Sequence, residues 1–317
     1  MPTNEVLNSS IGLHKKVTKL MGNRFELTVA AGSKDEGLSH INAAIKEISR
    51  IESLLTTYNE SSETALINRN AGTSPVKVSV ETFELIKRSK RISDITQGAF
   101  DISYGSIDKK LWNFDQQMTS LPDAATAKKM VRLINYRNII LDEKHTTVFL
   151  KEKGMRIGFG GIGKGYAAER AKAVLKDRGV TSGIVNASGD LTVWGRQPNG
   201  NKWTIGIADP ERISQPFSYL EITDTAIATS GNYEKYVMID GKKYSHTIDP
   251  KTGLPVRGIK SATVICANAE IADAMATPVM IMGINVALDM INQVQGMSCL
   301  LIDDNNKVYT SKNINLR

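Results

Sequence analysis

The stretch GFGGIGKGYAAER, residues 158–170, joins a glycine-rich turn to a segment of helix-forming residues. Gly158, Gly160 and Gly163 have the G-x-G-x-x-G spacing of dinucleotide-binding loops. The same run falls one residue short of the G-x-x-x-x-G-K-[ST] phosphate loop. Both motifs bind phosphate, so the stretch indicates an anion site at the start of a helix.

Neither motif is complete. A dinucleotide fold needs an acidic residue about 20 positions on, at the end of a parallel strand, whereas the strand predicted here ends near Asn186 and Asp190 comes late. The phosphate loop needs a hydroxyl after its lysine, and Gly165 stands there. The glycines, the N–H groups of the following helix and Lys164 still favour an anion. The alternative is that the glycines only allow a strand to turn into a helix.

The composition is that of a folded protein with a large core. The chain has 317 residues, of which 41% are hydrophobic and 23% charged. Its net charge of +7 comes from scattered residues without a basic block, which does not favour nucleic acid. Cys266 and Cys299 form no C-x-x-C pair, so a thiolate metal site is not expected. The sequence shows neither a membrane-spanning apolar run nor the apolar core of a secretory signal.

Hydrophobic periodicity predicts an α+β fold. Helices are predicted over 39–58, 81–100, 164–179, 268–283 and 289–296. A strand is predicted after Gly22, and three short runs at 138–143, 146–151 and 156–160 indicate an antiparallel meander. Further strands follow residue 183, and a hairpin is predicted at 298–311.

Asp273 and Thr277 lie four residues apart and therefore share one face of the helix predicted over 268–283. A carboxylate and a hydroxyl are oxygen ligands of the kind that Mg²⁺ accepts beside waters and phosphates. The alternative is that Asp273 interacts with the helix dipole. Pro278 leaves the carbonyl of Ala274 without its helical partner, which permits a kink beside the predicted site.

Eight short blocks, in this order, resemble the ApbE family of flavin transferases, also called FAD:protein FMN transferases. They run from about Leu20 to Gly283 and read LMGNRFEL, LLTTYNESSETALINRNAG, GAFDISYGSI, GGIGKGYAAE, NASGDL, AIATSGNYE, YSHTIDPKTGLPV and ADAMAT. The resemblance implies a T-fold-related α+β fold with mixed or antiparallel sheets and flanking helices. It further implies one transferase domain over 15–317, and leaves open a division into two closely packed α+β subdomains. Residues 1–14 are polar and are expected to form a flexible segment.

The resemblance also implies site residues, each with an alternative. Positions matching the family's FAD contacts are Met21, Tyr58, Ala99, Phe100, Asp101, Lys164 and His246. Positions matching its Mg²⁺ ligands are the Gly161 carbonyl, Asp273 and Thr277. His246 and Asp273 are the two candidates for the general base. On sequence alone, Met21 and Phe100 fit a core better than a cofactor site, whereas Tyr58 fits a surface position equally well and His246 a structural one equally well.

The implied reaction is the Mg²⁺-dependent transfer of FMN from FAD to a Thr or Ser hydroxyl of a target flavoprotein, with release of AMP. The glycine loop and Lys164 are then expected to hold the FAD pyrophosphate. Two alternatives use the same site: an FAD pyrophosphatase that releases FMN and AMP, and a non-catalytic FAD-binding protein.

The family implies an acceptor with a D-G-x-T/S-G-A-[ST] type motif, such as a subunit of a redox-driven ion pump. It also implies action at the periplasmic side of the inner membrane, although the sequence shows no leader and is equally compatible with the cytoplasm. One block and two single positions depart from the family pattern. The residues after GAFD read ISYGSI, where a V-G-P run is frequent. Gly158 stands where many members have aspartate, and Pro278 replaces a more usual alanine.

Overall fold

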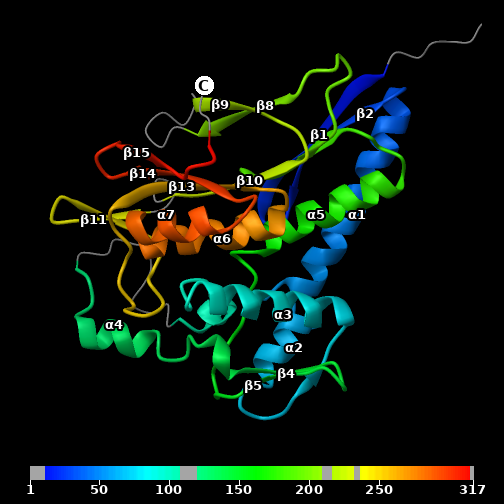
Figure 1. Cartoon of the computed structure of the whole chain (residues 1–317). Coiled ribbons are helices and arrows are strands. Elements are labelled where there is room, and N and C mark those ends of the chain that lie inside the picture. Colours follow the sequence, from blue (N-terminus) through cyan, green and yellow to red (C-terminus); the bar gives the residue numbers. More distant parts are fainter. Residues whose placement is uncertain (1–10, 108–119, 209–215, 232–235, 315–317) are drawn as a thin grey trace, which may run out of the picture.

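The computed structural model describes residues 11–107, 120–208, 216–231 and 236–314 (Figure 1). No helix in these ranges is both long and apolar enough to cross a membrane. The elements in chain order are β1 Gly12–Leu20, β2 Asn23–Ala31, α1 Lys34–Leu55, α2 Glu63–Arg69, β3 Val76–Lys77, α3 Val80–Ile95, η1 Ile102–Ser106, α4 Ala124–Met130, η2 Tyr136–Asn138, β4 Ile139–Asp142, β5 Thr147–Leu150, α5 Gly163–Asp177, β6 Gly183–Ala187, β7 Asp190–Trp194, β8 Trp203–Ala208, β9 Pro216–Ile222, β10 Thr225–Gly231, β11 Tyr236–Ile239, β12 Lys242–Ser245, β13 Ile259–Cys266, α6 Ala269–Met282, α7 Ile284–Gln293, β14 Ser298–Asp303 and β15 Val308–Thr310.

Eight of the described strands form one antiparallel sheet in the order β1-β2-β6-β7-β10-β13-β14-β15. Two of its hairpins have two-residue turns with both φ angles positive: Met21 and Gly22 at 50° and 73°, Ser188 and Gly189 at 54° and 100°. Turns of this kind match the twist of the flanking strands. The sheet confirms the predicted α+β class with antiparallel strands and flanking helices.

The two faces of the sheet are covered differently (Figure 1). Helices α1, α5 and α6 pack in sequence on one face, over a core that includes Phe25, Leu27 and Val264. The β8–β9 hairpin covers part of the other face, where Trp203 packs against Val193. Because side chains alternate along a strand, the central strands are apolar on both sides and form the floor of both cores.

The first strand begins earlier than the sequence indicated. Residues 12–14 belong to β1, within the segment predicted to be flexible; residues 1–10 of that segment lie outside the described ranges. The strand was missed because its inner face is polar: Lys16 donates to the Asn42 side chain of α1 at 2.9 Å, and His14 contacts the carbonyl of Ala31 at 3.3 Å. A period-2 apolar signal is therefore absent from β1.

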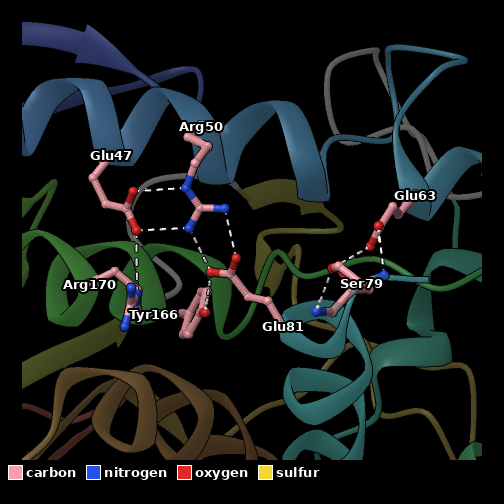
Figure 2. A network of polar contacts seen from close by, with 8 residues as sticks. Glu47, Arg50, Glu63, Ser79, Glu81, Tyr166 and Arg170 are labelled. Atoms are coloured by element: carbon pink, nitrogen blue, oxygen red, sulfur yellow. Dashed lines mark hydrogen bonds and ion pairs between the residues drawn. The ribbon is translucent and has the colours of Figure 1, made fainter. Parts of the chain in front are cut away.

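A second layer lies beneath α5 and α6 in Figure 1 and contains α2, α3 and a small sheet in the order β3-β5-β4. Figure 2 shows the polar network that joins it to the main body. Arg50 of α1 makes hydrogen bonds of 2.7 and 2.8 Å to Glu81 of α3, and the Tyr166 hydroxyl of α5 donates to Glu81 at 2.6 Å. Arg88 of α3 pairs with Glu270 of α6 at 2.6 Å. Helix α3 is thereby attached to three helices of the main layer.

The strand predicted over 156–160 is wrong, since these residues form no strand in the structure. Their backbone groups pair with side chains instead of a neighbouring strand. Ile157 exchanges two hydrogen bonds with the Asn68 side chain, at 2.7 and 3.0 Å, and Arg156 exchanges two with the Ser106 hydroxyl, at 2.8 and 2.9 Å. Asn68 comes from α2, a helix that was not predicted in the polar segment 59–75.

Candidate active site

A cleft of about 680 Å³ lies where the second layer meets the sheet and α6. Its volume is within the range of about 300–1,000 Å³ that is usual for small-molecule and cofactor sites. Six residues predicted for the site line it: Ala99, Phe100, Asp101, Gly161, His246 and Thr277. Segments far apart in the sequence thus meet in one cavity, as the prediction required.

The segment after α3 brings the first three of these residues to the cleft. Helix α3 ends at Ile95, and Gly98 turns the chain at φ 80°. The backbone N–H of Phe100 then donates to the Thr96 hydroxyl at 3.1 Å. This places the Phe100 ring 3.7 Å from where a Cβ on Gly161 would lie, so the ring packs against the glycine loop.

Asp101 lines the cleft but uses its carboxylate for structure. One oxygen accepts from the backbone N–H and the hydroxyl of Ser103, at 2.8 and 2.6 Å, and the other accepts from the N–H of Tyr136 at 2.8 Å. Burial raises the pKa of Asp101 even though these hydrogen bonds favour its ionised form. Asp101 therefore fixes the cleft wall around η1 and η2, and any contact with a flavin would come from atoms not engaged in this network.

The glycine loop leaves space on its cleft side. A Cβ at Gly160 would meet nothing within 4 Å, and one at Gly158 would meet only Thr57, at 3.9 Å. Gly165 serves a different purpose, since a Cβ there would lie 2.1 Å from the carbonyl oxygen of Ala269. Gly165 thus permits α5 to contact the start of α6 closely, as glycine does wherever backbones approach.

Asp273 caps the start of α5. Its carboxylate accepts from the backbone N–H of Gly165 at 2.9 Å, and also from that of Lys164. The Lys164 ammonium pairs with Asp190 of β7. The N–H groups and the lysine that the sequence assigned to a pyrophosphate are therefore engaged by two carboxylates. Asp273 is thus an anion of the chain itself at this helix start, as the helix dipole favours, and the pyrophosphate contact of Lys164 stays a prediction.

The surroundings of Asp273 do not fully compensate the negative charge of its carboxylate. Its side chain is 6% exposed. Burial and the nearby Asp190 carboxylate raise the pKa of Asp273 to about 7, while Lys164 and the backbone N–H groups oppose the rise. A buried carboxylate beside a second one favours the approach of a cation, because the charged form lacks full compensation.

The donor set fits a magnesium ion. Thr277, on the same face of α6 as Asp273, and Gly161 both line the cleft, and the Thr277 and Ser230 hydroxyl oxygens lie 3.4 Å apart. No cluster of three or more His, Cys, Asp or Glu side chains suited to a metal occurs in the described residues. Mg²⁺ accepts one carboxylate together with neutral oxygens, waters and phosphates, which is the chemistry that Asp273, Thr277 and the Gly161 carbonyl offer.

Besides Lys164, two predicted flavin contacts, Met21 and Tyr58, lie outside the residues that line the cleft. Met21 occupies the β1–β2 turn, and its methyl carbon lies 3.6 Å from where a Cβ on Gly163 would be. It packs partly buried over the start of α5. Tyr58 follows α1 and is 96% exposed, whereas its neighbour Thr57 lines the cleft. Both residues thus lie beside segments of the cleft, and their contacts with FAD stay predictions.

Sequence reasoning missed several residues of the site. Arg156 and Tyr104 line the cleft, and Arg156 is the one Lys or Arg among its described lining residues. Its position just before the glycine loop was a usable signal. Asp190 was noted only as too late for a ribose contact, yet it lies in the block NASGDL and pairs with Lys164. Ser230 of β10 carries no signal beyond the block AIATSGNYE.

Comparison with known proteins agrees with this geometry. A model of the ApbE family matches residues 21–301. The FAD:protein FMN transferase of Klebsiella pneumoniae is 32% identical over 287 residues, which cover 90% of this chain and 88% of that protein. The FAD:protein FMN transferase of Treponema pallidum is 27% identical, covering 87% and 81% of the two chains.

Solved structures show the same fold. The crystal structure of the ApbE protein of Thermotoga maritima superposes with a TM-score of 0.85 at 29% identity, covering 95% of this chain and 97% of that one. The flavin transferase ApbE of Vibrio cholerae gives a TM-score of 0.82 at 24% identity, covering 95% and 98%, and shows the fold alone. With a family model spanning most of its length, a relative above 30% identity and the shared fold, the chain belongs to the ApbE family.

Proposed function

We propose that this protein transfers FMN from FAD to a Thr or Ser hydroxyl of an acceptor flavoprotein and releases AMP, in a Mg²⁺-dependent reaction. The observation that carries the proposal is the cleft, which brings together six residues predicted for flavin, metal and base. The names of its relatives, FAD:protein FMN transferase, support the same reaction.

The chemistry is a displacement at the phosphorus of the FMN half of FAD. The acceptor oxygen forms a bond to that phosphorus, and the bond from the phosphorus to the bridging oxygen of the phosphoanhydride breaks. The electron pair leaves with AMP, and the hydroxyl proton passes to a base in the cleft. FMN is then held in a phosphoester linkage to the acceptor. Catalysis of such a step depends mainly on positioning and on neutralising phosphate charge.

The Asp273 carboxylate, the Thr277 hydroxyl and the Gly161 carbonyl would hold Mg²⁺. When bound, Mg²⁺ supplies positive charge that neutralises phosphate oxygens and the leaving group. The burial of Asp273 and the nearby Asp190 carboxylate raise the pKa of Asp273 and support this assignment, because a cation beside them would stabilise the charged form.

His246 is the better of the two candidate bases. It lines the cleft, while Asp273 is buried behind it and engaged with backbone N–H groups of α5. Histidine is the side chain that most often serves as a general base in enzymes. Asp273 has instead the contacts of a structural and metal-binding group.

Arg156 binds phosphate oxygens of FAD in this proposal. Lys164 pairs with Asp190, and Arg156 supplies the cleft with a guanidinium, which stays charged at all relevant pH values. The two hydrogen bonds between its backbone and Ser106 fix the position from which the side chain extends. Guanidinium groups bind phosphate oxygens in pairs, so Arg156 orients the substrate as well as attracting it.

The test is an incubation of the protein with FAD, Mg²⁺ and an acceptor domain that carries a D-G-x-T/S-G-A-[ST] motif. Intact mass spectrometry of the acceptor and chromatography of the nucleotides are the two readouts. The proposal expects one FMN added per acceptor, an equal amount of AMP, and loss of both with EDTA. Free FMN with AMP would instead make the protein a pyrophosphatase, and intact FAD with tight binding would make it a flavin-binding protein.

The place of action expected from the family resemblance, the periplasmic side of the inner membrane, is also a proposal, as is an acceptor that belongs to a redox-driven ion pump. Cell fractionation of the native host, with detection of this chain and of flavinylated proteins in each fraction, tests both. Recovery of the chain and its flavinylated target in the cytoplasm alone would contradict them.

A further inference from the structure

A second pocket, of about 310 Å³, lies next to the cleft. It is built from the turn after α3, the residues from α4 to η2, and Pro250 with Lys251. Figure 1 shows α4 at the outer end of the second layer. Four cationic side chains line this pocket, which we call the basic pocket: Lys128, Arg132, Arg137 and Lys251.

The basic pocket and the cleft share a wall. Asp101 lines both cavities. The chain also runs from His246, in the cleft, to Lys251, in the basic pocket, within a few residues. A molecule that spans this wall can therefore place one group among the four cations and another at the reaction site.

The charge of the basic pocket is not neutralised within the described part of the chain. None of the four cations takes part in an ion pair there, although exposed pairs such as Lys87–Glu143 occur elsewhere in the protein. Asp101 is the acidic residue among the described lining residues, and its oxygens accept from Ser103 and Tyr136 rather than from a cation. The basic pocket therefore attracts an anion from solution.

The walls of the basic pocket are fixed by contacts within the protein. The turn IDPKTG at 248–253 forms one of these walls by packing against α4. Gly253, at φ 74°, approaches α4 so closely that a Cβ would lie 2.1 Å from the carbonyl oxygen of Ala127. Lys128 donates to the carbonyl of Lys251 at 2.6 Å. The Arg137 guanidinium stacks 4.6 Å from the centroid of the Tyr136 ring. These contacts hold two walls and two of the cations, Lys128 and Arg137, in place before any ligand arrives.

We propose that the basic pocket binds an acidic segment of the acceptor protein, and this inference rests on the transferase function proposed above. The acceptor hydroxyl must reach the FMN phosphorus inside the cleft, so the chain around that hydroxyl must cover the cleft's rim. The basic pocket shares Asp101 with the cleft and carries positive charge without an ion-pair partner in the described residues, in a protein with a net charge of +7. Complementary charge at the rim of an interface speeds encounter and selects the partner.

The first test is a kinetic comparison of two double variants. Arg132→Gln/Lys251→Gln removes two cations of the basic pocket, and Lys46→Gln/Lys202→Gln removes two exposed cations that line neither cavity. The pocket variant should raise KM for the acceptor about fivefold at low salt, without changing KM for FAD, and the difference should shrink as salt is added. Equal KM values for the two variants would overturn the proposal.

The second test does not need turnover. A fluorescent peptide of alternating glutamate and glycine, with a glutamine–glycine peptide as control, is titrated with the FAD-free protein and followed by anisotropy. We expect the acidic peptide to bind the wild type and the Lys46→Gln/Lys202→Gln control, and to bind the pocket variant about fivefold more weakly.

The outcomes separate the two proposals. If the wild type binds the acidic peptide through these residues but never flavinylates an acceptor, the transferase proposal fails and the basic pocket keeps its acidic ligand. If the pocket variant weakens binding of FAD or of inorganic phosphate and leaves the KM for the acceptor and the peptide affinity unchanged, the basic pocket serves a small anion and the proposal is wrong.

Discussion

The carboxylate of Asp273 accepts a hydrogen bond of 2.9 Å from the backbone N–H of Gly165. This contact joins α6, which carries two predicted metal ligands, to the start of α5, which follows the glycine loop. It exists because Gly165 has no side chain: a Cβ there would lie 2.1 Å from the Ala269 carbonyl oxygen and 2.7 Å from the Cβ of Asp273. Sequence, helix packing and site geometry are thus linked at one residue.

Gly165→Ala should therefore separate the two helices. We expect a loss of about 1–3 kcal/mol in the free energy of unfolding, as for overpacked cores, even though alanine is the better helix former by about 1 kcal/mol. The rate of AMP formation from FAD should fall by more than the small fraction of unfolded protein explains, because Asp273 moves with α6. Thermal unfolding and an AMP assay measure the two effects. Gly160→Ala, where a Cβ meets nothing within 4 Å, is the control and should unfold like the wild type.

Asp273→Asn should abolish Mg²⁺-dependent activity while the protein stays folded. The amide is of similar size and its oxygen accepts from the same backbone N–H groups of α5, so the cap is kept and the charge is lost. Turnover should fall more than about 100-fold, since even residues that only support metal ligands cost 10- to 100-fold. Titration of Mg²⁺ against AMP formation checks this, with circular dichroism for folding. Wild-type Mg²⁺ dependence in the variant would remove Asp273 from the metal site.

The fold was largely predictable, because long amphipathic helices and alternating strands have strong periodic signals. The wrong or missing strand predictions have a common cause. Polar side chains either occupy the inner face of a strand or form hydrogen bonds with backbone groups that were expected to pair with a neighbouring strand. Strand β1 has a polar inner face on α1. Segment 156–160 pairs with the side chains of Asn68 and Ser106 instead of a strand. A single sequence carries no periodic trace of such pairings.

The site was predictable as a set of residues but not as a set of contacts. Family blocks located six cleft residues, including Thr277 and His246. They did not reveal that Asp273 caps α5 or that Asp190 forms an ion pair with Lys164. Nor did they reveal that the Asp101 carboxylate accepts hydrogen bonds from backbone N–H groups. These roles depend on which groups face each other across 108 residues for Asp273, 26 for Asp190 and 35 for Asp101, and spacing along the chain does not determine that.

His246→Gln should lower turnover by about 100- to 10,000-fold, the usual contribution of a general base. FAD binding should change little, because glutamine keeps a polar side chain in the same place. The pH–rate profile should lose its rise on the acidic side, which reports deprotonation of the base. Single-turnover AMP release across a pH series measures both. A variant that keeps the wild-type profile would show that His246 only binds substrate.

Arg156→Gln should weaken FAD binding by about 10- to 100-fold, because hydrogen bonds to charged groups contribute about 1.5–3 kcal/mol. Arg156→Lys should recover part of the affinity, since it restores the charge but not the paired geometry. Quenching of flavin fluorescence gives the affinity, and unfolding curves verify that the Ser106 contacts, which use the backbone of residue 156, are kept. Unchanged affinity in the glutamine variant would remove Arg156 from the phosphate site.

Arg50 should govern the acid stability of the contact between the two layers (Figure 2). Its hydrogen bonds lower the pKa values of Glu47 and Glu81 below the usual 4.5. The folded state therefore binds fewer protons than the unfolded state in this range, and the stabilisation is complete above about pH 5 and lost as pH falls through the lowered values. Arg50→Met should cost about 1 kcal/mol at neutral pH, because the network is partly exposed.

The same variant should flatten the dependence of unfolding free energy on pH between about pH 5 and 3, since the hydrogen bonds from Arg50 are the largest cause of the lowered pKa of both carboxylates. Urea unfolding at a series of pH values measures this slope, and Lys46→Met on the same helix is the matched control. A slope like that of the wild type would mean that other cations, of which Arg170 is the nearest to Glu47 at 3.4 Å, hold the two carboxylates ionised without Arg50.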